Sequence, residues 1–215
     1  KCDFLYAGAL PGSRHDPRAT RARALRTGLE IIRESIGDDS FLLGCGCPIL
    51  SGVGLVDGMR IGMDVAPYWK DRLRTKLLDD RNALCTRSSV INTINRAFMH
   101  QRLFINDPDC LLVRSDRNKM TLDQVRVLAT TVALSGGMFV ISDNMRTISE
   151  DRLELLQTAA RYRTRGMEVV GLHEGFEPDT LIGRTKSSVL VALLNLSDKP
   201  VSKIIDLKDL MSMKE

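Results

Sequence analysis

The spacing of apolar residues changes along the chain between a helical and an extended period, which predicts alternating α-helices and β-strands. Leu25 and Leu29 recur at helical spacing within residues 19–36, and Gly37 follows them as a typical helix end. The next apolar run, residues 41–45, is short and lies between polar residues and a glycine. Such a run is typical of a strand buried on both faces, as in parallel sheets. This part of the chain therefore predicts the α/β class.

The same alternation continues as far as about residue 166. We expect further helices over residues 83–102, between Thr121 and Gly136, and over residues 149–162, and further strands over residues 103–105 and 138–141. Residues 1–6 read as the end of a buried strand. The segment 52–62 is irregular, because its apolar residues leave little room for a helix before another strand-like piece.

Beyond Gly166 the pattern changes, since residues 167–172 and 188–195 are rich in β-formers with no helix between them. We expect two domains, 1–166 and 167–215, the second being the start of an antiparallel β module. The first domain holds about five strand-and-helix units, whereas a complete (β/α)₈ barrel needs eight. The expected fold is a partial TIM barrel, about its last five units without its N-terminal half, followed by part of a β-sandwich.

Composition and charge are those of an ordinary globular protein and exclude a strongly basic nucleic-acid binder. Of 215 residues, 43% are apolar, and 31 basic against 27 acidic residues give a net charge of +4, spread along the chain. The arginines of residues 14–33 alternate with apolar helix positions. This spacing favours a solvated outer helix face over a nucleic-acid patch.

The lack of a recognisable targeting segment and the pattern of cysteines predict a soluble, cytoplasmic chain. The sequence shows no initiator Met, no signal-peptide pattern and no membrane-spanning apolar run, and we expect a truncated chain whose absent N-terminus leaves secretion open. The odd set of five cysteines fits a reducing compartment. Cys45 and Cys47 lack the partners that a zinc site needs, which favours buried free thiols, and no metal is expected.

Acidic residues follow several predicted strands, at the end where barrel enzymes carry their reacting groups. Asp3, Asp64 and Asp107 all lie at such places, and Lys1 shares a strand face with Asp3. Each aspartate alone is more often a helix cap or a turn former. Jointly they suit glycoside hydrolysis, which needs one ionised carboxylate as nucleophile and one protonated carboxyl as acid, and Arg60 can tune their charge.

These segments resemble the α-galactosidase (melibiase) family of glycoside hydrolases, clan D, over about residues 1–200. The matching stretches, in the family's order, are Lys1-Cys2-Asp3, Arg60-Ile61-Gly62-Met63-Asp64, Asn106-Asp107-Pro108-Asp109, and Ser135-Gly136-Gly137-Met138 with Ser142-Asp143-Asn144. The resemblance implies a retaining double displacement on an α-galactoside. It gives Asp3 the role of nucleophile and Asp64 that of acid/base.

The resemblance also implies which residues bind the sugar. Lys1 and Arg60 match positions that hold sugar hydroxyls, and Cys45, Cys47 and Asp107 match strand-end segments near the pocket. It implies no cofactor, no nucleic acid and no membrane as partner, and it leaves oligomerisation open. Because the first barrel strands would supply part of the pocket, we expect the chain by itself to be inactive.

Two other functions compete with this interpretation. The first is a barrel aldolase or isomerase acting on a sugar phosphate, with Lys1 as the reactive amine. Gly136 and Gly137 precede their strand, however, whereas barrel phosphate sites follow the late strands. The second is a carbohydrate-binding relative without turnover, which the intact Asp3 and Asp64 do not favour.

Overall fold

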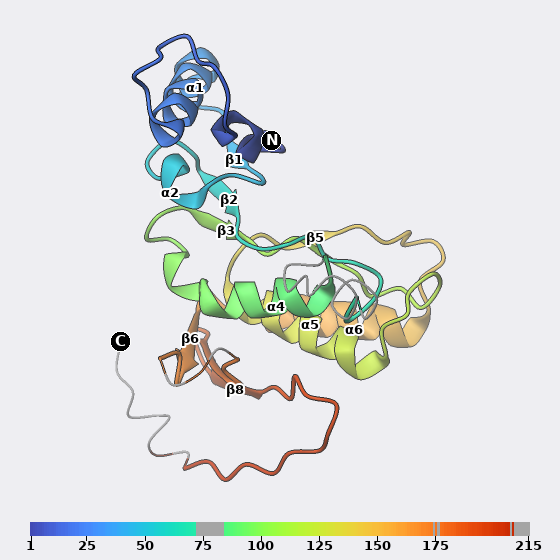
Figure 1. The fold of residues 1–215 in the computed structure, drawn as a ribbon. Helices are drawn as coiled ribbons and strands as arrows, with labels where there is room; N and C mark the ends of the chain where they lie inside the picture. Colours follow the sequence, from blue (N-terminus) through green and yellow to red (C-terminus); the bar gives the residue numbers. More distant parts are fainter. Residues whose placement is uncertain (72–83, 174, 176, 207, 209–215) are drawn as a thin grey trace. The chain divides into compact units, whose positions relative to one another are not determined.

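The structure is a computed structural model that describes residues 1–71, 84–173, 175, 177–206 and 208 (Figure 1). Its contacts divide the chain into two compact units. Unit 1 is Lys1–Ile61 with Met99–Asp107, and unit 2 is Gly62–Phe98 with Pro108–Glu215. Each unit has a hydrophobic core of its own.

Unit 1 is built on a parallel sheet with the strand order β1-β2-β3. Its elements are η1 (Leu5–Ala9), α1 (Arg21–Ile36), β1 (Leu43–Gly44), α2 (Ile49–Gly52), β2 (Gly58–Arg60) and β3 (Ile105–Asp107). Cys2 adds a parallel bridge to Gly44 beside β1. Consecutive strands therefore pair in parallel and in chain order, which is the pairing that a (β/α) barrel requires.

Helix α1 confirms the prediction for residues 19–36 and supplies much of the core of unit 1. The Thr20 hydroxyl accepts a hydrogen bond from the backbone N–H of Arg23 at 3.2 Å, and Gly37 ends the helix at φ 71°. Leu25 and Leu29 are buried and belong to the same apolar cluster as the β2 residue Met59.

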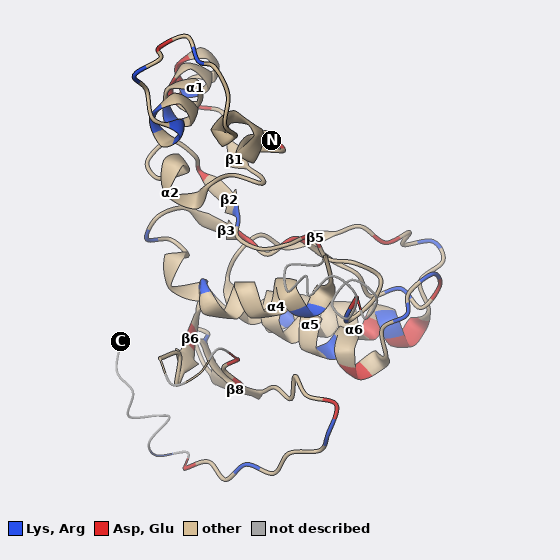
Figure 2. Ribbon diagram, in the orientation of Figure 1, with Lys and Arg blue, Asp and Glu red and all other residues tan. Residues whose placement is uncertain are grey.

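The arginines of α1 (Figure 2) are less solvated than the sequence suggested. Arg26 Nη1 donates to the carbonyl oxygens of Ser51 and Val53 at 3.3 and 3.0 Å. Arg33 Nε donates to Leu55 O at 2.9 Å, and its Nη2 lies 2.5 Å from Asp57 Oδ2. Arg21 and Arg23 are exposed as expected, whereas these two guanidinium groups are partly buried because they bind carbonyls of residues 51–55.

Unit 2 contains helices beside a two-stranded parallel sheet and a three-stranded antiparallel one. Its elements are α4 (Thr86–Asn95), β4 (Cys110–Leu111), α5 (Leu122–Ser135), β5 (Val140–Ile141), α6 (Glu150–Arg161), β6 (Met167–Val170), β7 (Thr180–Arg184) and β8 (Val189–Leu193), and η2 (Ala97–Met99) follows α4. Helix α5 buries eight of its residues, among them Val125 and Leu128 of the apolar core.

The ends of α5 follow from its sequence. Thr121 and Gln124 form a reciprocal capping box, as the predicted N-cap requires. Gly136 ends the helix at φ 71°. A Cβ atom at this position would lie 2.3 Å from the carbonyl carbon of Arg165, so the backbones approach too closely for any other residue.

The structure confirms that the strands after residue 166 pair in the antiparallel direction, as the sequence predicted. Strands β6, β7 and β8 pair antiparallel in that order, and Leu181 and Ile182 of β7 are almost fully buried. The sequence predicted β6 and β8 but missed β7. Helix α6 matches its prediction, although Ser149 occupies the N-cap position without a side-chain capping bond.

Two predicted elements differ from the structure. Residues 1–6 do not form a buried strand, because Phe4 at φ 53° turns the chain into the 3₁₀ helix η1 and leaves only the Cys2 bridge. The helix predicted over 83–102 spans Thr86–Asn95, and residue 83 lies outside the described residues. Among the helices that the structure describes, none is long and apolar enough to cross a bilayer.

Candidate active site

Within unit 1, five of the predicted site residues form one linked group. Lys1 Nζ lies 3.9 Å from Asp3 Oδ2, and the Cys45 thiol is hydrogen-bonded to the Asp3 carboxylate. The positive charge of Arg60 lowers the pKa of Asp3, and its guanidinium forms an ion pair with Asp107. These residues come from the Cys2 bridge and from the ends of β1, β2 and β3, the strand ends at which the sequence placed them.

Backbone hydrogen bonds fix Asp3 beside Cys45. Cys2 N–H donates to Leu43 O at 2.9 Å, and Cys45 N–H donates back to Cys2 O at 2.8 Å. Leu5 N–H then donates to Cys45 O at 3.2 Å, so hydrogen bonds hold the backbone on both sides of Asp3. Gly46 follows with φ 59°, a left-handed conformation that glycine adopts without strain.

The pKa of Asp3 is lowered from its usual value. The hydrogen bond from the Cys45 thiol is the main cause, followed by the backbone N–H of Phe4, which lies 2.8 Å from Asp3 Oδ1. Burial opposes this shift, and the charges of Lys1 and Arg60 lower the pKa further. The carboxylate is thus ionised at neutral pH and about half exposed, as an accessible nucleophile must be.

Cys45 supports this state because its thiol keeps its proton. Burial, and then the hydrogen bond to Asp3, raise the pKa of Cys45 to about 11. The thiol therefore stays a hydrogen-bond donor across the physiological range. All five cysteines are free, and Cys45, Cys47 and Cys85 are buried, which agrees with the predicted buried thiols.

Arg60 and Asp107 form a buried ion pair across the β2–β3 register. Arg60 Nε donates to Asp107 Oδ2 at 3.1 Å, and the two side chains are 8% and 4% exposed. The register places these two residues directly opposite each other. The pair fixes the guanidinium at the strand end, and its removal from water makes it sensitive to the loss of either partner.

Cys47 lies apart from this charged group. Its side chain belongs to the apolar core of unit 1, and its thiol donates to Pro48 O at 3.5 Å. Burial raises the pKa of Cys47 to about 11. Packing accounts for its position, so the structure offers no observation in favour of a sugar contact at this residue.

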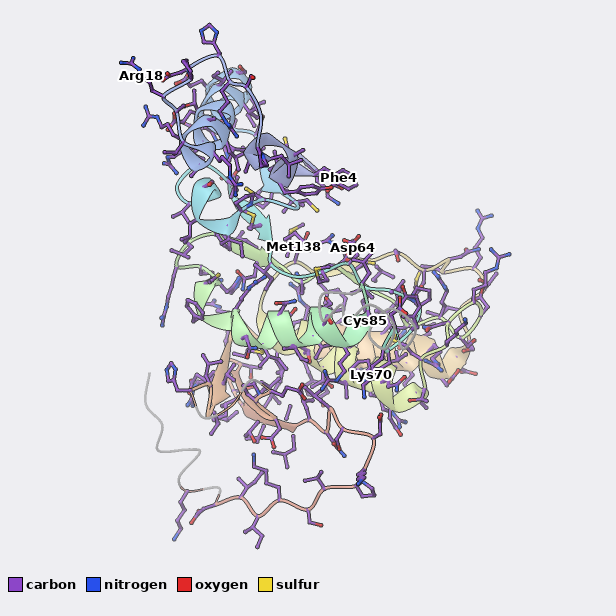
Figure 3. All side chains as sticks on the ribbon, viewed as in Figure 1. Phe4, Arg18, Asp64, Lys70, Cys85 and Met138 are labelled. Carbon is purple, nitrogen blue, oxygen red and sulfur yellow. The ribbon has the colours of Figure 1, made fainter. Side chains whose placement is uncertain are left out.

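Asp64 lies in unit 2, on the long connection between β2 and α4 (Figure 3). Its side chain is exposed, in a stretch without regular secondary structure. The next residue, Val65, donates its backbone N–H to Asp109 Oδ2 at 2.7 Å. In the sequence, Asp109 stands out only as part of the stretch Asn106-Asp107-Pro108-Asp109, which carries no signal for this bond.

Asp143, from the stretch Ser142-Asp143-Asn144, caps the backbone of a neighbouring loop. Its side chain is fully buried and accepts the backbone N–H groups of Val113 and Arg114 at 2.6 and 3.1 Å. Arg114 Nη1 adds a contact at 3.4 Å. The carboxylate therefore ties the segment after β4 to the segment after β5.

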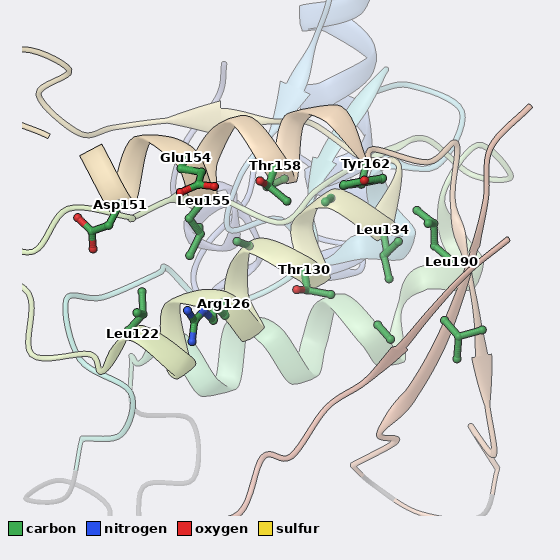
Figure 4. Close-up of a pocket in the computed structure, with 15 residues that line it drawn as sticks. Leu122, Arg126, Thr130, Leu134, Asp151, Glu154, Leu155, Thr158, Tyr162 and Leu190 are labelled. Atoms are coloured by element: carbon green, nitrogen blue, oxygen red, sulfur yellow. The ribbon is translucent and has the colours of Figure 1, made fainter. Parts of the chain in front are cut away.

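A cavity of about 510 Å³ lies elsewhere in unit 2, between α5, α6 and β8 (Figure 4). Its wall is mainly apolar, with Arg126 of α5 and Asp151 and Glu154 of α6 as its charged residues. None of the seven predicted site residues lines it. The chemistry indicated by the sequence therefore belongs to the strand ends and not to this cavity.

Comparison with known proteins finds solved structures that are similar to this chain. No protein-family model matches the chain. TtGalA, an α-galactosidase from Thermus thermophilus, is similar in its complex with p-nitrophenyl α-D-galactopyranoside, with 27% identity, a TM-score of 0.66 and coverage of 83% of this chain and 34% of the enzyme. Its stachyose complex gives 30% identity, a TM-score of 0.64 and coverage of 73% and 32%.

A more distant solved structure shares the fold. α-Galactosidase I from Mortierella vinacea matches with a TM-score of 0.52 at 16% identity, over 80% of this chain and 46% of its own. These matches support the partial TIM-barrel and sandwich architecture expected from the sequence. The chain spans about a third of the length of the Thermus enzyme.

Proposed function

Because this chain belongs to the α-galactosidase family of glycoside hydrolases, we propose that it carries the reacting groups of an enzyme that cleaves terminal α-galactosides or a closely related sugar. The observation that supports this most directly is the environment of Asp3. This half-exposed carboxylate has a lowered pKa and follows the parallel bridge of Cys2 to Gly44. It accepts a hydrogen bond from a thiol and lies near the cations Lys1 and Arg60. That environment suits an ionised nucleophile.

The proposed reaction is a double displacement that retains the anomeric configuration. In the first step an Asp3 oxygen forms a bond to the anomeric carbon while the glycosidic C–O bond breaks, and Asp64 gives its proton to the leaving oxygen. In the second step Asp64 takes a proton from water, whose oxygen attacks the anomeric carbon and releases Asp3. Substrate, water and the two carboxyl groups balance both steps without another reactant.

The neighbours of Asp3 have separate tasks in this proposal. Lys1 and Arg60 hold sugar hydroxyls and stabilise the Asp3 carboxylate between turnovers. Asp107 is buried and paired with Arg60, so it acts by fixing that guanidinium and not by touching sugar. Cys45 donates to Asp3, and Cys47 is assigned to packing. No cofactor takes part in these steps.

We further propose how the chain is divided. The Cys2 bridge and strands β1 to β5 would belong to the last five strand-and-helix units of the barrel, within residues 1–166. Strands β6 to β8 would open the β-sandwich domain within 167–215. Parallel pairing in chain order before residue 166 and antiparallel pairing after it support this division.

A sugar-phosphate aldolase or isomerase has less support. A lysine that forms a Schiff base needs desolvation or a cationic neighbour to lower its pKa. Lys1 is instead 47% exposed in its side chain and lies beside the carboxylate of Asp3.

The test is hydrolysis of p-nitrophenyl α-galactoside by the complete protein that contains this sequence, beside a panel of other nitrophenyl glycosides. We expect α-galactoside cleavage by the wild type and its loss in Asp3→Asn. Wild-type protein that cleaves no glycoside of the panel, or full turnover in Asp3→Asn, would overturn the proposal. Cleavage of a different sugar only would keep the mechanism and change the substrate.

A further inference from the structure

The backbone that follows Asp64 is held by residues from distant parts of unit 2. Asp109 Oδ2 accepts the N–H of Val65 at 2.7 Å, while Asp109 Oδ1 accepts the N–H of Cys110 at 2.6 Å. Asp109 is 9% exposed and has φ 79°, a conformation that is rare for a residue with a side chain. Both carboxylate oxygens are therefore engaged, and one holds the residue beside Asp64.

Thr86, the first residue of α4, holds the next position. Its side chain is fully buried, and its hydroxyl accepts the N–H of Ala66 at 3.2 Å and donates to Ala66 O at 2.6 Å. The same residue donates its own N–H to Tyr68 O at 3.2 Å. One threonine thus fixes both backbone groups of Ala66 and anchors the segment on the N-terminus of the helix.

Further bonds complete the attachment of this segment. Lys119 N–H donates to Pro67 O at 2.8 Å, and Arg87 N–H donates to Trp69 O at 3.1 Å. Trp69 is 7% exposed and belongs to the core of unit 2. Within residues 61–71 Asp64 is the one residue classed as exposed, and a fixed backbone carries it.

We propose that Asp109 and Thr86 are positioning residues for Asp64, an inference that rests on the acid/base role assigned to Asp64 under the proposed function. General acid catalysis needs the acid within hydrogen-bond reach of the leaving oxygen, and a misplacement of about 1 Å can cost about 100-fold in rate. A charged acceptor such as Asp109 holds an N–H more firmly than a neutral one. The two residues act through the backbone of Val65 and Ala66 and touch no substrate.

A positioning role for an acid predicts a specific kinetic signature. A leaving group of low pKa departs without protonation, whereas a sugar alcohol needs the proton from Asp64. Displacement of the acid therefore slows the cleavage of substrates with poor leaving groups far more than that of substrates with good ones. We expect Asp109→Asn to lower kcat/KM for melibiose by about 10- to 100-fold and to leave 2,4-dinitrophenyl α-galactoside nearly unchanged.

The experiment measures kcat/KM for both substrates in the complete protein, with Asp64→Asn as the reference for loss of the acid. Asp143→Asn is the matched control, because Asp143 is an equally buried carboxylate that accepts two backbone N–H groups in the same unit. If Asp143→Asn changes kcat/KM, it should lower kcat/KM for both substrates by the same factor. A selective loss in Asp109→Asn but not in Asp143→Asn supports positioning.

Thr86→Val and Thr86→Ser keep the proposal testable if Asp109→Asn does not fold. The valine removes the hydroxyl at nearly constant volume, so Thr86→Val should show the selective loss of kcat/KM for melibiose. The serine keeps the hydroxyl, so Thr86→Ser should keep the wild-type ratio of kcat/KM for the two substrates. Equal loss on both substrates in Asp109→Asn or Thr86→Val, with a selective loss in Asp64→Asn, would overturn the positioning role alone. Equal loss in Asp64→Asn itself would overturn the acid/base role.

Discussion

At the scale of single residues, the site depends on how each charged group is partnered. Asp3 and Asp107 are both strand-end aspartates, yet one is half exposed beside a thiol and the other is buried against a guanidinium. The two environments give the carboxylates different tasks, since an accessible ionised group can react while a paired buried group can only position.

Cys45 is predicted to control the acid side of the pH profile. Its thiol is the main cause of the lowered pKa of Asp3, so Cys45→Ala should raise that pKa toward the usual value. The nucleophile must be ionised, and the acidic limb of kcat/KM should therefore move to higher pH. Cys47→Ala is the control, because that thiol bonds Pro48 O. An unmoved limb in Cys45→Ala would contradict this assignment.

The Arg60–Asp107 pair is predicted to matter strongly for stability. Asp107→Ala leaves the buried Arg60 charge without this partner and should lower the free energy of unfolding by about 3–5 kcal/mol. The exposed pair of Arg126 and Asp123, at 59% and 86%, gives the comparison. Asp123→Ala should cost less than about 1 kcal/mol in urea unfolding. Equal costs would show that burial does not decide the strength of the pair.

Residue roles could be predicted only where the sequence carries a local signal. The strand-end positions of Asp3 and Arg60 followed from short apolar runs and from family motifs. The bond from Asp109 to Val65 spans 44 positions in the sequence, and no local pattern encodes it. The core position of Cys47 also depends on α1 packing, which spacing along its own strand end cannot reveal.

At the scale of elements, helices were predicted better than strands. Helices α1, α5 and α6 have long apolar periods and clear end signals, and each lies close to its predicted range. The parallel strands are two or three residues long, so their bounds depend on pairing and not on their own sequence. Strand β7 was missed because its run is interrupted by Gly183 and flanked by polar residues.

Gly136 gives a direct test of an element junction. Gly136→Ala needs an unfavourable φ of +71° and places a Cβ atom 2.3 Å from Arg165, so it should destabilise the protein by at least about 2 kcal/mol. Gly28→Ala, within α1, meets no atom within 4 Å. It should instead stabilise by about 0.5–1 kcal/mol. Thermal unfolding of both variants measures the contrast, and similar melting temperatures would contradict it.

At the scale of the whole molecule, the chain combines a parallel and an antiparallel architecture. Pairing in chain order among β1, β2 and β3 is that of a barrel, and β6 to β8 form an open antiparallel sheet. The sequence predicted this change from alternating helices and strands to strands alone, because the helical spacing of apolar residues ends near residue 166. The similarity to the Thermus α-galactosidase at 27–30% identity supports the same architecture.

The central claim is that Asp3 forms the covalent bond to the sugar. The most direct measurement is to incubate the complete protein with a fluorinated galactosyl fluoride that forms the glycosyl-enzyme quickly and releases it slowly. Mass spectrometry of the digested protein then locates the label. We predict one galactosyl adduct on the peptide that contains Asp3 and none in Asp3→Asn. An adduct on Asp64 or another residue, or turnover without any adduct, would contradict the account.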